Sequence, residues 1–185
     1  MTLPTLAVVS GPPGAGKTTL AHDLARRLGC PAVIRDEIKR GMVLAADTHR
    51  VGLDDPLDYA ALDAFFAVLA TLLRAGVTVV AEAAYQDRLW RPGLDDMAKI
   101  ARIRVVRCTV PSSLAYDRIR RRRDHDPHRG AHADRQLLDE LDSGRRTLDS
   151  FVWISLDAPM LVVETSDGYR PGLNDIADFV TTGGE

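Results

Sequence analysis

The sequence contains little cysteine and little net charge, and each shortage excludes a class of protein. Only two of the 185 residues are cysteines, Cys30 and Cys108, and they form no C-x-x-C pair. We therefore expect reduced thiols in a cytoplasmic protein rather than a disulfide framework. The formal net charge of −2 does not suggest general nucleic-acid binding, although a local basic patch is compatible with it.

Several recognisable segments are also missing. No uncharged apolar stretch is long enough to span a membrane, and no basic region precedes the N-terminal apolar run, so we expect no signal peptide. The sequence lacks the guanine-binding N-K-x-D motif and the L-S-G-G-Q signature, which argues against a GTPase and an ABC-type ATPase. With 27% charged and 45% hydrophobic residues, the chain is predicted to form one globular domain over residues 1–185.

The most informative segment is rich in glycine. Residues 11–18 read GPPGAGKT, which fits the phosphate-loop pattern G-x-x-x-x-G-K-[ST] at every fixed position. An apolar run at residues 6–10 precedes the loop, and Leu20, Leu24 and Leu28 follow it at helical spacing. Strand, loop and helix in this order bind phosphate through backbone N–H groups and the positive helix end. The residues expected to hold ATP are Gly11, Pro12, Pro13, Gly14, Ala15, Gly16, Lys17, Thr18 and Thr19.

Strand and helix patterns alternate along the chain and predict an α/β fold with a mainly parallel sheet. The expected strands lie at residues 6–10, 32–34, 77–81, 103–108 and 160–164. The expected helices lie at residues 17–28, 38–45, 59–75, 92–100, 112–123, 134–150 and 173–181. Pro92 suits the first turn of its helix, and we expect loops at residues 47–58 and 124–133, the second of them mobile.

Ligands of parallel sheets bind at the carboxyl ends of the strands, where this chain places acidic residues. Asp36, after the second strand, is either the general base for an attacking hydroxyl or an N-cap of the next helix. Glu82, after the third strand, either holds Mg²⁺ through water, binds the acceptor or is a solvated carboxylate. Lys17 is predicted to act on the β- and γ-phosphates, and the Thr18 hydroxyl to ligate Mg²⁺.

An arginine-rich helix end allows three interpretations. Arg118 and Arg122 are four residues apart and share a helix face. They suit a lid that clamps ATP phosphates and stabilises transition-state charge. A solvated helix end and a nucleic-acid patch are the alternatives, although no aromatic residues are interleaved for base stacking.

Two further clusters of residues allow either a structural or a functional interpretation. His125, His128 and His132 lie among aspartates, so a metal site is conceivable, although no cysteine accompanies them. Tyr85 and Trp90 either line an acceptor pocket or belong to the core.

These motifs together resemble a group of small P-loop kinases. The group includes the kinase domain of phage polynucleotide kinase, zeta toxins, chloramphenicol phosphotransferase and gluconate kinase. The resemblance rests on the phosphate loop, on residues 34–39 (IRDEIK) and on Val110-Pro111 followed by Arg118 and Arg122. It implies a three-layer P-loop NTPase fold, with a five-stranded parallel sheet, helices on both faces and a helical lid. It also implies that Asp36 is the general base.

Two departures concern the acceptor. Lys39 stands where the polynucleotide kinase has an arginine, and residues 82–85 (EAAY) do not match its Asp-x-Asn run. Arg35, Asp36, Lys39 and Glu82 are the predicted acceptor-binding residues. The leading hypothesis is an ATP- and Mg²⁺-dependent kinase that acts on a hydroxyl group of a small molecule. A polynucleotide 5′-hydroxyl kinase and an ATPase switch without an acceptor are the alternatives.

Overall fold

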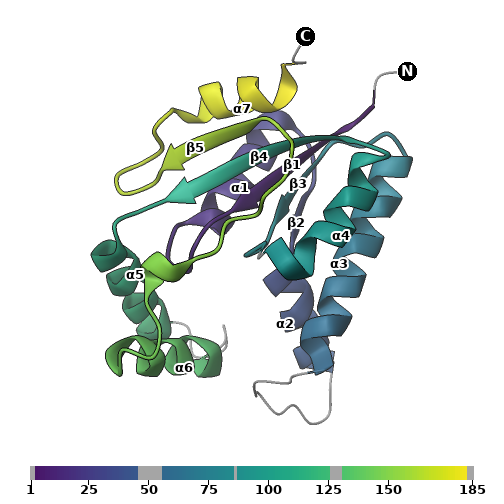
Figure 1. The fold of residues 1–185 in the computed structure, drawn as a ribbon. Helices are drawn as coiled ribbons and strands as arrows, with labels where there is room; N and C mark the ends of the chain where they lie inside the picture. Colours follow the sequence, from purple (N-terminus) through teal and green to yellow (C-terminus); the bar gives the residue numbers. More distant parts are fainter. Residues whose placement is uncertain (1–2, 46–55, 86, 126–130, 183–185) are drawn as a thin grey trace.

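The computed structural model describes residues 3–45, 56–85, 87–125 and 131–182. Its five strands form one parallel sheet in the order β2-β3-β1-β4-β5 (Figure 1). The strands are β1 (Thr5–Ser10), β2 (Ala32–Ile34), β3 (Val79–Glu82), β4 (Arg102–Thr109) and β5 (Met160–Glu164). Every residue of the central strand β1 is buried, as expected where helices cover both faces of a parallel sheet.

Seven helices and one 3₁₀ turn complete the described part of the chain. They are α1 (Lys17–Leu28), α2 (Arg35–Ala45), α3 (Pro56–Arg74), α4 (Asp87–Ala98), α5 (Ser112–His125), α6 (Ala131–Asp142), the 3₁₀ turn at Leu148–Ser150 and α7 (Leu173–Thr181). Two separate apolar cores show that α1 and α7 cover one face of the sheet, while α3 and α4 cover the other. This arrangement confirms the predicted three-layer P-loop NTPase fold.

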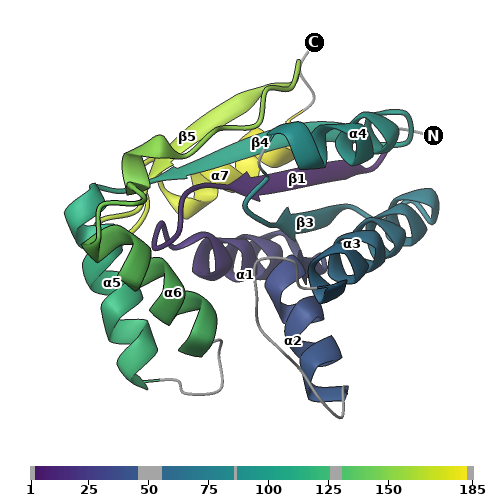
Figure 2. The same ribbon diagram turned by 60° about the horizontal axis from the view of Figure 1, so that its bottom comes forward.

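Two pairs of helices stand at opposite sides of the carboxyl ends of the strands (Figure 2). On one side, α5 packs on α6 through a small core of its own, formed by Ile119, Leu137 and Leu138. On the other side, α2 packs along α3 and buries none of its own residues completely. The α5–α6 pair therefore corresponds to the predicted helical lid, and α2–α3 faces it across the end of the sheet.

Some predicted boundaries were wrong. Pro92 lies inside α4 rather than at its start, because the helix already begins at Asp87. The prediction of a loop through residue 58 fails at its end, because α3 begins at Pro56 and includes Asp58 in its first turn. The predicted helical segment at residues 134–150 is α6, a turn and a short 3₁₀ helix, since α6 ends at Asp142.

Helix α3 is long and apolar enough, by length and composition, to cross a membrane. It nevertheless packs on the sheet through buried side chains that include Phe65, Leu69 and Leu73. The fit is close at Gly93 of α4, where an added Cβ would lie 2.3 Å from the ring of Phe66. An apolar helix in this position is the core helix of an α/β sheet.

Candidate active site

The phosphate loop has the backbone geometry that its glycines predict. It connects β1 to α1, and Gly14 adopts a left-handed conformation with φ of 79°. An added Cβ at Gly14 would lie 2.5 Å from the carbonyl oxygen of Ala115 in α5. Both the positive φ and this close approach require glycine. The lid helix α5 therefore begins directly against the phosphate loop.

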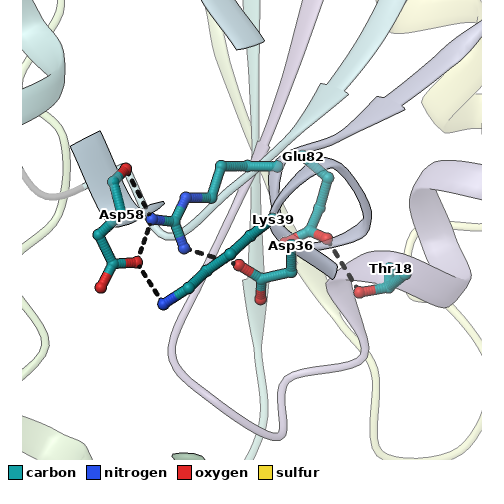
Figure 3. A network of polar contacts seen from close by, with 6 residues as sticks. Thr18, Asp36, Lys39, Asp58 and Glu82 are labelled. Atoms are coloured by element: carbon teal, nitrogen blue, oxygen red, sulfur yellow. Dashed lines mark hydrogen bonds and ion pairs between the residues drawn. The ribbon is translucent and has the colours of Figure 1, made fainter. Parts of the chain in front are cut away.

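The predicted metal residues lie within hydrogen-bond distance of each other. The Thr18 hydroxyl donates to Glu82 Oε2 at 2.9 Å (Figure 3). Glu82 is buried at the end of β3, and burial raises the pKa of its carboxyl group, while the charge of Lys17 opposes that shift. Lys17 itself donates from Nζ to the carbonyl oxygen of Pro12 at 3.1 Å. A hydroxyl and a carboxylate are the oxygen ligands that Mg²⁺ prefers.

Strand register explains why distant segments meet here. Glu82 of β3 pairs with Val9 of β1 on one side and with Ile34 of β2 on the other. The phosphate loop follows β1 and Arg35 follows β2, so both leave the sheet beside Glu82. The expectation that these three segments lie together at the carboxyl ends of the strands agrees with their positions, although Glu82 is the last residue of the strand rather than a residue after it.

Asp36 lies next to the Thr18–Glu82 pair (Figure 3). Helix α2 begins at Arg35, so Asp36 belongs to its first turn and is not the N-cap. Its side chain is 83% exposed and accepts a hydrogen bond from Arg35 Nη1 at 3.1 Å. The negative charge of Asp36 also contributes to raising the pKa of Glu82, after burial. An exposed carboxylate beside the Thr18–Glu82 pair is accessible to an incoming hydroxyl.

Arg35 and Lys39 both bind Asp58 of α3. Lys39 Nζ lies 2.9 Å from Asp58 Oδ1, and Arg35 Nη2 donates to the carbonyl oxygen of Asp58 at 3.0 Å as well as to its carboxylate. Figure 3 shows this cluster next to Asp36 and the Thr18–Glu82 pair. Sequence analysis assigned residue 58 to a loop and therefore missed its role in the cluster.

On the nucleotide side, Arg118 is held by backbone oxygens. Its Nη1 donates to the carbonyl oxygen of Gly14 at 3.3 Å, and its Nη2 donates to those of Thr165 and Ser166 at 2.6 and 3.1 Å. The Thr165 hydroxyl in turn donates to the carbonyl oxygen of Ala15 at 3.0 Å. Arg118 therefore links the lid, the phosphate loop and the segment after β5.

Arg122, the second predicted lid arginine, forms a bidentate pair with Asp134 of α6. Nε and Nη2 lie 2.7 and 2.5 Å from the two carboxylate oxygens. The Asp134 hydrogen bond is the main cause that raises the pKa of Arg122, and the negative charges of Asp36 and Glu82 add to it. The guanidinium thus lies within electrostatic reach of both carboxylates, which stand on other elements.

A cleft of ≈ 870 Å³ lies between the phosphate loop and the lid. Gly14, Lys17, Thr18, Thr19, Arg118 and Arg122 line it together with the segment after β5. Tyr169 of that segment donates to Asp23 of α1 at 2.6 Å, a hydrogen bond that lowers the pKa of Asp23. Because ligands of parallel sheets bind at the carboxyl ends of the strands, the position of β5 indicates Thr165 and its neighbours as ligand-binding candidates. The sequence analysis did not include them.

The remaining candidates are two aromatic residues, two cysteines and three histidines. Tyr85 and Trp90 are buried in the core with ring centroids 4.9 Å apart, which agrees with the core reading. Both cysteines are free. The side chains of His125, His128 and His132 lie outside the part of the chain that the structure describes. Within that part, no three His, Cys, Asp or Glu residues are grouped so as to hold a metal ion.

Comparisons with known proteins agree with this fold. A family model described as an AAA domain matches residues 6–147. A curated bifunctional pantoate ligase/cytidylate kinase of Gloeobacter violaceus is 28% identical over 139 residues, which are 75% of this chain. The match spans only 25% of that relative's length.

Two solved structures have the same fold along nearly the whole chain. A suspected kinase of Chloroflexus aurantiacus j-10-fl superposes with a TM-score of 0.79 at 24% identity and covers 97% of both chains. The Mycobacterium tuberculosis APS kinase CysC, solved with AMPPNP and APS, has a TM-score of 0.65 at 16% identity. That match covers 98% of this chain and 100% of the other.

Proposed function

The chain belongs to this AAA-domain family of P-loop kinases, and we propose that it transfers the γ-phosphate of ATP to a hydroxyl group of a small molecule. One observation carries the proposal. The exposed carboxylate of Asp36 stands beside the Thr18–Glu82 pair, and Arg122 reaches both carboxylates electrostatically from the lid. A catalytic aspartate after the second strand would have little purpose in a pure nucleotide switch, whereas an alcohol acceptor needs a proton acceptor there.

The residues present fit Mg·ATP. The phosphate loop offers a cradle that a Cβ at Gly14 would fill, and α1 directs its positive end toward it. Thr18 and Glu82 supply oxygen ligands for Mg²⁺, Glu82 directly or through water. When bound, the metal neutralises charge on the β- and γ-phosphates. Lys17 would exchange the carbonyl oxygen of Pro12 for phosphate oxygens.

Asp36 would accept the proton of the attacking hydroxyl. Its carboxylate is held by Arg35 Nη1, which fixes its orientation while its exposure leaves room for an acceptor. In this scheme Arg35 orients the base, and Lys39 supports Arg35 through their shared partner Asp58.

The two lid arginines would have different roles. Arg118 is bound to backbone oxygens on three sides and closes the nucleotide side of the cleft. Arg122 is held at Nε and Nη2 by Asp134, and within the described residues this leaves Nη1 for charge that develops on the transferred phosphoryl group.

A single-turnover assay with γ-labelled ATP and Mg²⁺ tests the proposal. The protein is incubated with a pool of hydroxyl-bearing metabolites, with a 5′-hydroxyl oligonucleotide, or with neither. We expect label on a small molecule, and we expect Asp36→Asn to abolish it without loss of Mg·ATP binding. Label on the oligonucleotide alone would identify a polynucleotide kinase instead, and label on inorganic phosphate alone in every arm would identify an ATPase.

A further inference from the structure

Helix α1 carries a second polar side chain on the face that bears Thr18. His22 lies four residues after Thr18, which places both on the same side of the helix, and both line the cleft. Thr18 donates to the carboxylate of Glu82 in β3, and His22 Nε2 lies 3.0 Å from Oε1 of Glu37 in α2. One face of α1 therefore binds a carboxylate from the sheet and a carboxylate from α2.

Glu37 follows Asp36 directly, in the first turn of α2. A hydrogen bond at Glu37 therefore restrains the backbone that carries the proposed base. Within the described residues, the Asp36 carboxylate accepts its hydrogen bond from Arg35 Nη1. Arg35 belongs to the same turn, so this bond orients the Asp36 side chain but does not hold the turn against the phosphate-loop helix.

Helix α2 is attached to α3 by other contacts. Two ion pairs run from α2 to Asp58 of α3, and Ile38 is partly buried against the core on that face of the sheet. These contacts remain when His22 is changed, so we expect α2 to stay folded without it. The contact with His22 joins α2 to the helix that begins with Lys17 and Thr18.

The contact between His22 and Glu37 adds little to the stability of the fold. The two side chains are 44% and 38% exposed, and partly exposed pairs of this kind stabilise a protein only weakly. A small misplacement of a catalytic group can nevertheless lower a rate by up to about a hundredfold. The loss of this contact should therefore be visible in the reaction rate and hardly visible in a melting curve.

We propose that His22 is a positioning residue that holds Asp36 in place relative to the phosphate-loop helix, through Glu37. The inference rests on the proposed function, because it takes Asp36 to accept the proton of the acceptor hydroxyl. His22 Nε2 donates the hydrogen bond, Glu37 Oε1 accepts it, and the first turn of α2 transmits the restraint to Asp36.

Backbone hydrogen exchange in Mg·AMPPNP tests whether His22 holds α2, without any acceptor. The amide groups of residues 39–41 close the first turn of α2, because each donates to the carbonyl group four residues before it. We expect His22→Ala to speed their exchange by up to about fivefold. His22→Gln should restore the wild-type exchange, because its amide N–H reaches about as far as Nε2. Arg27→Ala, which breaks a hydrogen bond from α1 to Asn174 of α7, is the matched control and should leave α2 unchanged.

Label transfer to the pool of hydroxyl-bearing metabolites tests whether this restraint acts on catalysis. Single-turnover rates are measured over a range of Mg·ATP concentrations. We expect His22→Ala to lower the maximal rate by about tenfold and to leave the half-saturating ATP concentration unchanged. His22→Gln should recover most of the loss, and Arg27→Ala should change neither quantity. A changed half-saturating concentration with an unchanged maximal rate would show that His22 binds the nucleotide instead.

Two double variants identify the path from His22 to Asp36. His22→Ala/Glu37→Ala should be no slower than either single variant, because both substitutions break the same contact. In the Asp36→Asn background, His22→Ala should cost no further rate, because the group that it positions is absent. A purely structural role of His22 would lower the rate by the same factor in both backgrounds.

The outcomes separate this inference from the proposed function. Unchanged exchange in His22→Ala, or an equal rate loss with and without Asp36, would overturn the role of His22 and leave a kinase. Label transfer to no hydroxyl compound would overturn the proposed function and the catalytic role of His22 with it, while hydrogen exchange would still show whether His22 holds α2. Glu37→Ala breaks the same contact from α2 and repeats the exchange test if His22→Ala does not fold.

Discussion

Two arginines of the candidate active site, Arg118 and Arg35, are held by different means. On the nucleotide side, Arg118 donates to carbonyl oxygens of the phosphate loop and of the segment after β5. On the proposed acceptor side, formed by α2 and the start of α3, Arg35 binds the carboxylates of Asp36 and Asp58, and Lys39 binds that of Asp58. The positions of carbonyl oxygens are set by the path of the backbone and depend little on which side chains are present. A carboxylate partner depends on the residue that a neighbouring helix presents, so the acceptor side is more particular to this chain.

Asp36→Asn should produce the largest effect, because it should lower the rate of phosphoryl transfer while Mg·ATP binding is retained. Asparagine keeps the shape of the side chain but accepts no proton, so we expect phosphoryl transfer to fall by roughly two to four orders of magnitude. Mg·ATP affinity should stay near wild type, because Lys17 and Thr18 hold the nucleotide. Stopped-flow or single-turnover rates and calorimetric ATP titration measure the two quantities.

Lys17→Ala is the opposite case, since it removes the cation of the phosphate loop and leaves the acceptor side intact. We expect it to lose most ATP affinity or turnover.

If Asp36→Asn retained near-wild-type turnover, Asp36 would leave the mechanism, and Glu37 or Glu82 would become the candidate base.

Gly93→Ala should destabilise the protein while sparing nucleotide binding. The added methyl group would lie 2.3 Å from the Phe66 ring, where α4 packs on α3. Overpacking of this kind costs about 1–3 kcal/mol of unfolding free energy. Chemical denaturation measures that loss, and ATP titration of the folded protein provides the comparison. A loss of ATP-binding free energy as large as the loss of unfolding free energy would show that the α3–α4 core and the nucleotide site are coupled.

The sequence predicted the nucleotide side better than the acceptor side, for a physical reason. The phosphate loop is a local motif, because its glycines, Lys17 and Thr18 are contiguous and their geometry is set by one strand–loop–helix unit. Parallel register then places Glu82 beside that loop, so the carboxyl-end rule was sufficient. The Arg35–Asp58 contact joins residues 23 positions apart on two helices. No spacing rule predicts such a contact.

The lid illustrates the same limit. Helical spacing correctly put Arg118 and Arg122 on one helix, and both line the cleft. Their partners could not be inferred, because Asp134 lies on α6 and the oxygens of Thr165 follow β5. Pro92 misled the prediction, since proline favours a first turn but is tolerated here inside α4.

Arg122→Ala should destabilise the lid by a smaller amount, because it leaves the nearly buried carboxylate of Asp134 without its bidentate partner. The Arg122 side chain is 43% exposed, so we expect a loss of only about 1 kcal/mol in unfolding free energy. The double variant Arg122→Ala/Asp134→Asn should recover most of that loss, because no unpaired charge remains. A double variant as unstable as the sum of its parts would show that the pair is not coupled.

The smallest expected effect is a pH dependence that distinguishes the partners of Arg35 from those of Arg118. Hydrogen bonds from Lys39 and Arg35 outweigh burial and lower the pKa of Asp58 below its usual 3.8. A carboxyl group with a lowered pKa stabilises the folded state above its unfolded pKa, and this contribution is lost as pH falls through the folded value.

The difference in unfolding free energy between wild type and Asp58→Asn should therefore be constant from pH 7 to about pH 5 and shrink below about pH 4. Because Asp58 is 43% exposed, the change should stay under about 1 kcal/mol. Urea titrations at each pH measure it, with Asp63→Asn as the control for a carboxylate outside the cluster. The corresponding difference for Arg118→Ala should vary much less over this pH range, because Arg118 donates to carbonyl and hydroxyl oxygens, which do not titrate there, and acts on the Glu164 carboxylate only through its charge. Equal pH dependence of the two differences would mean that the two sides do not hold their arginines by the distinct means described above.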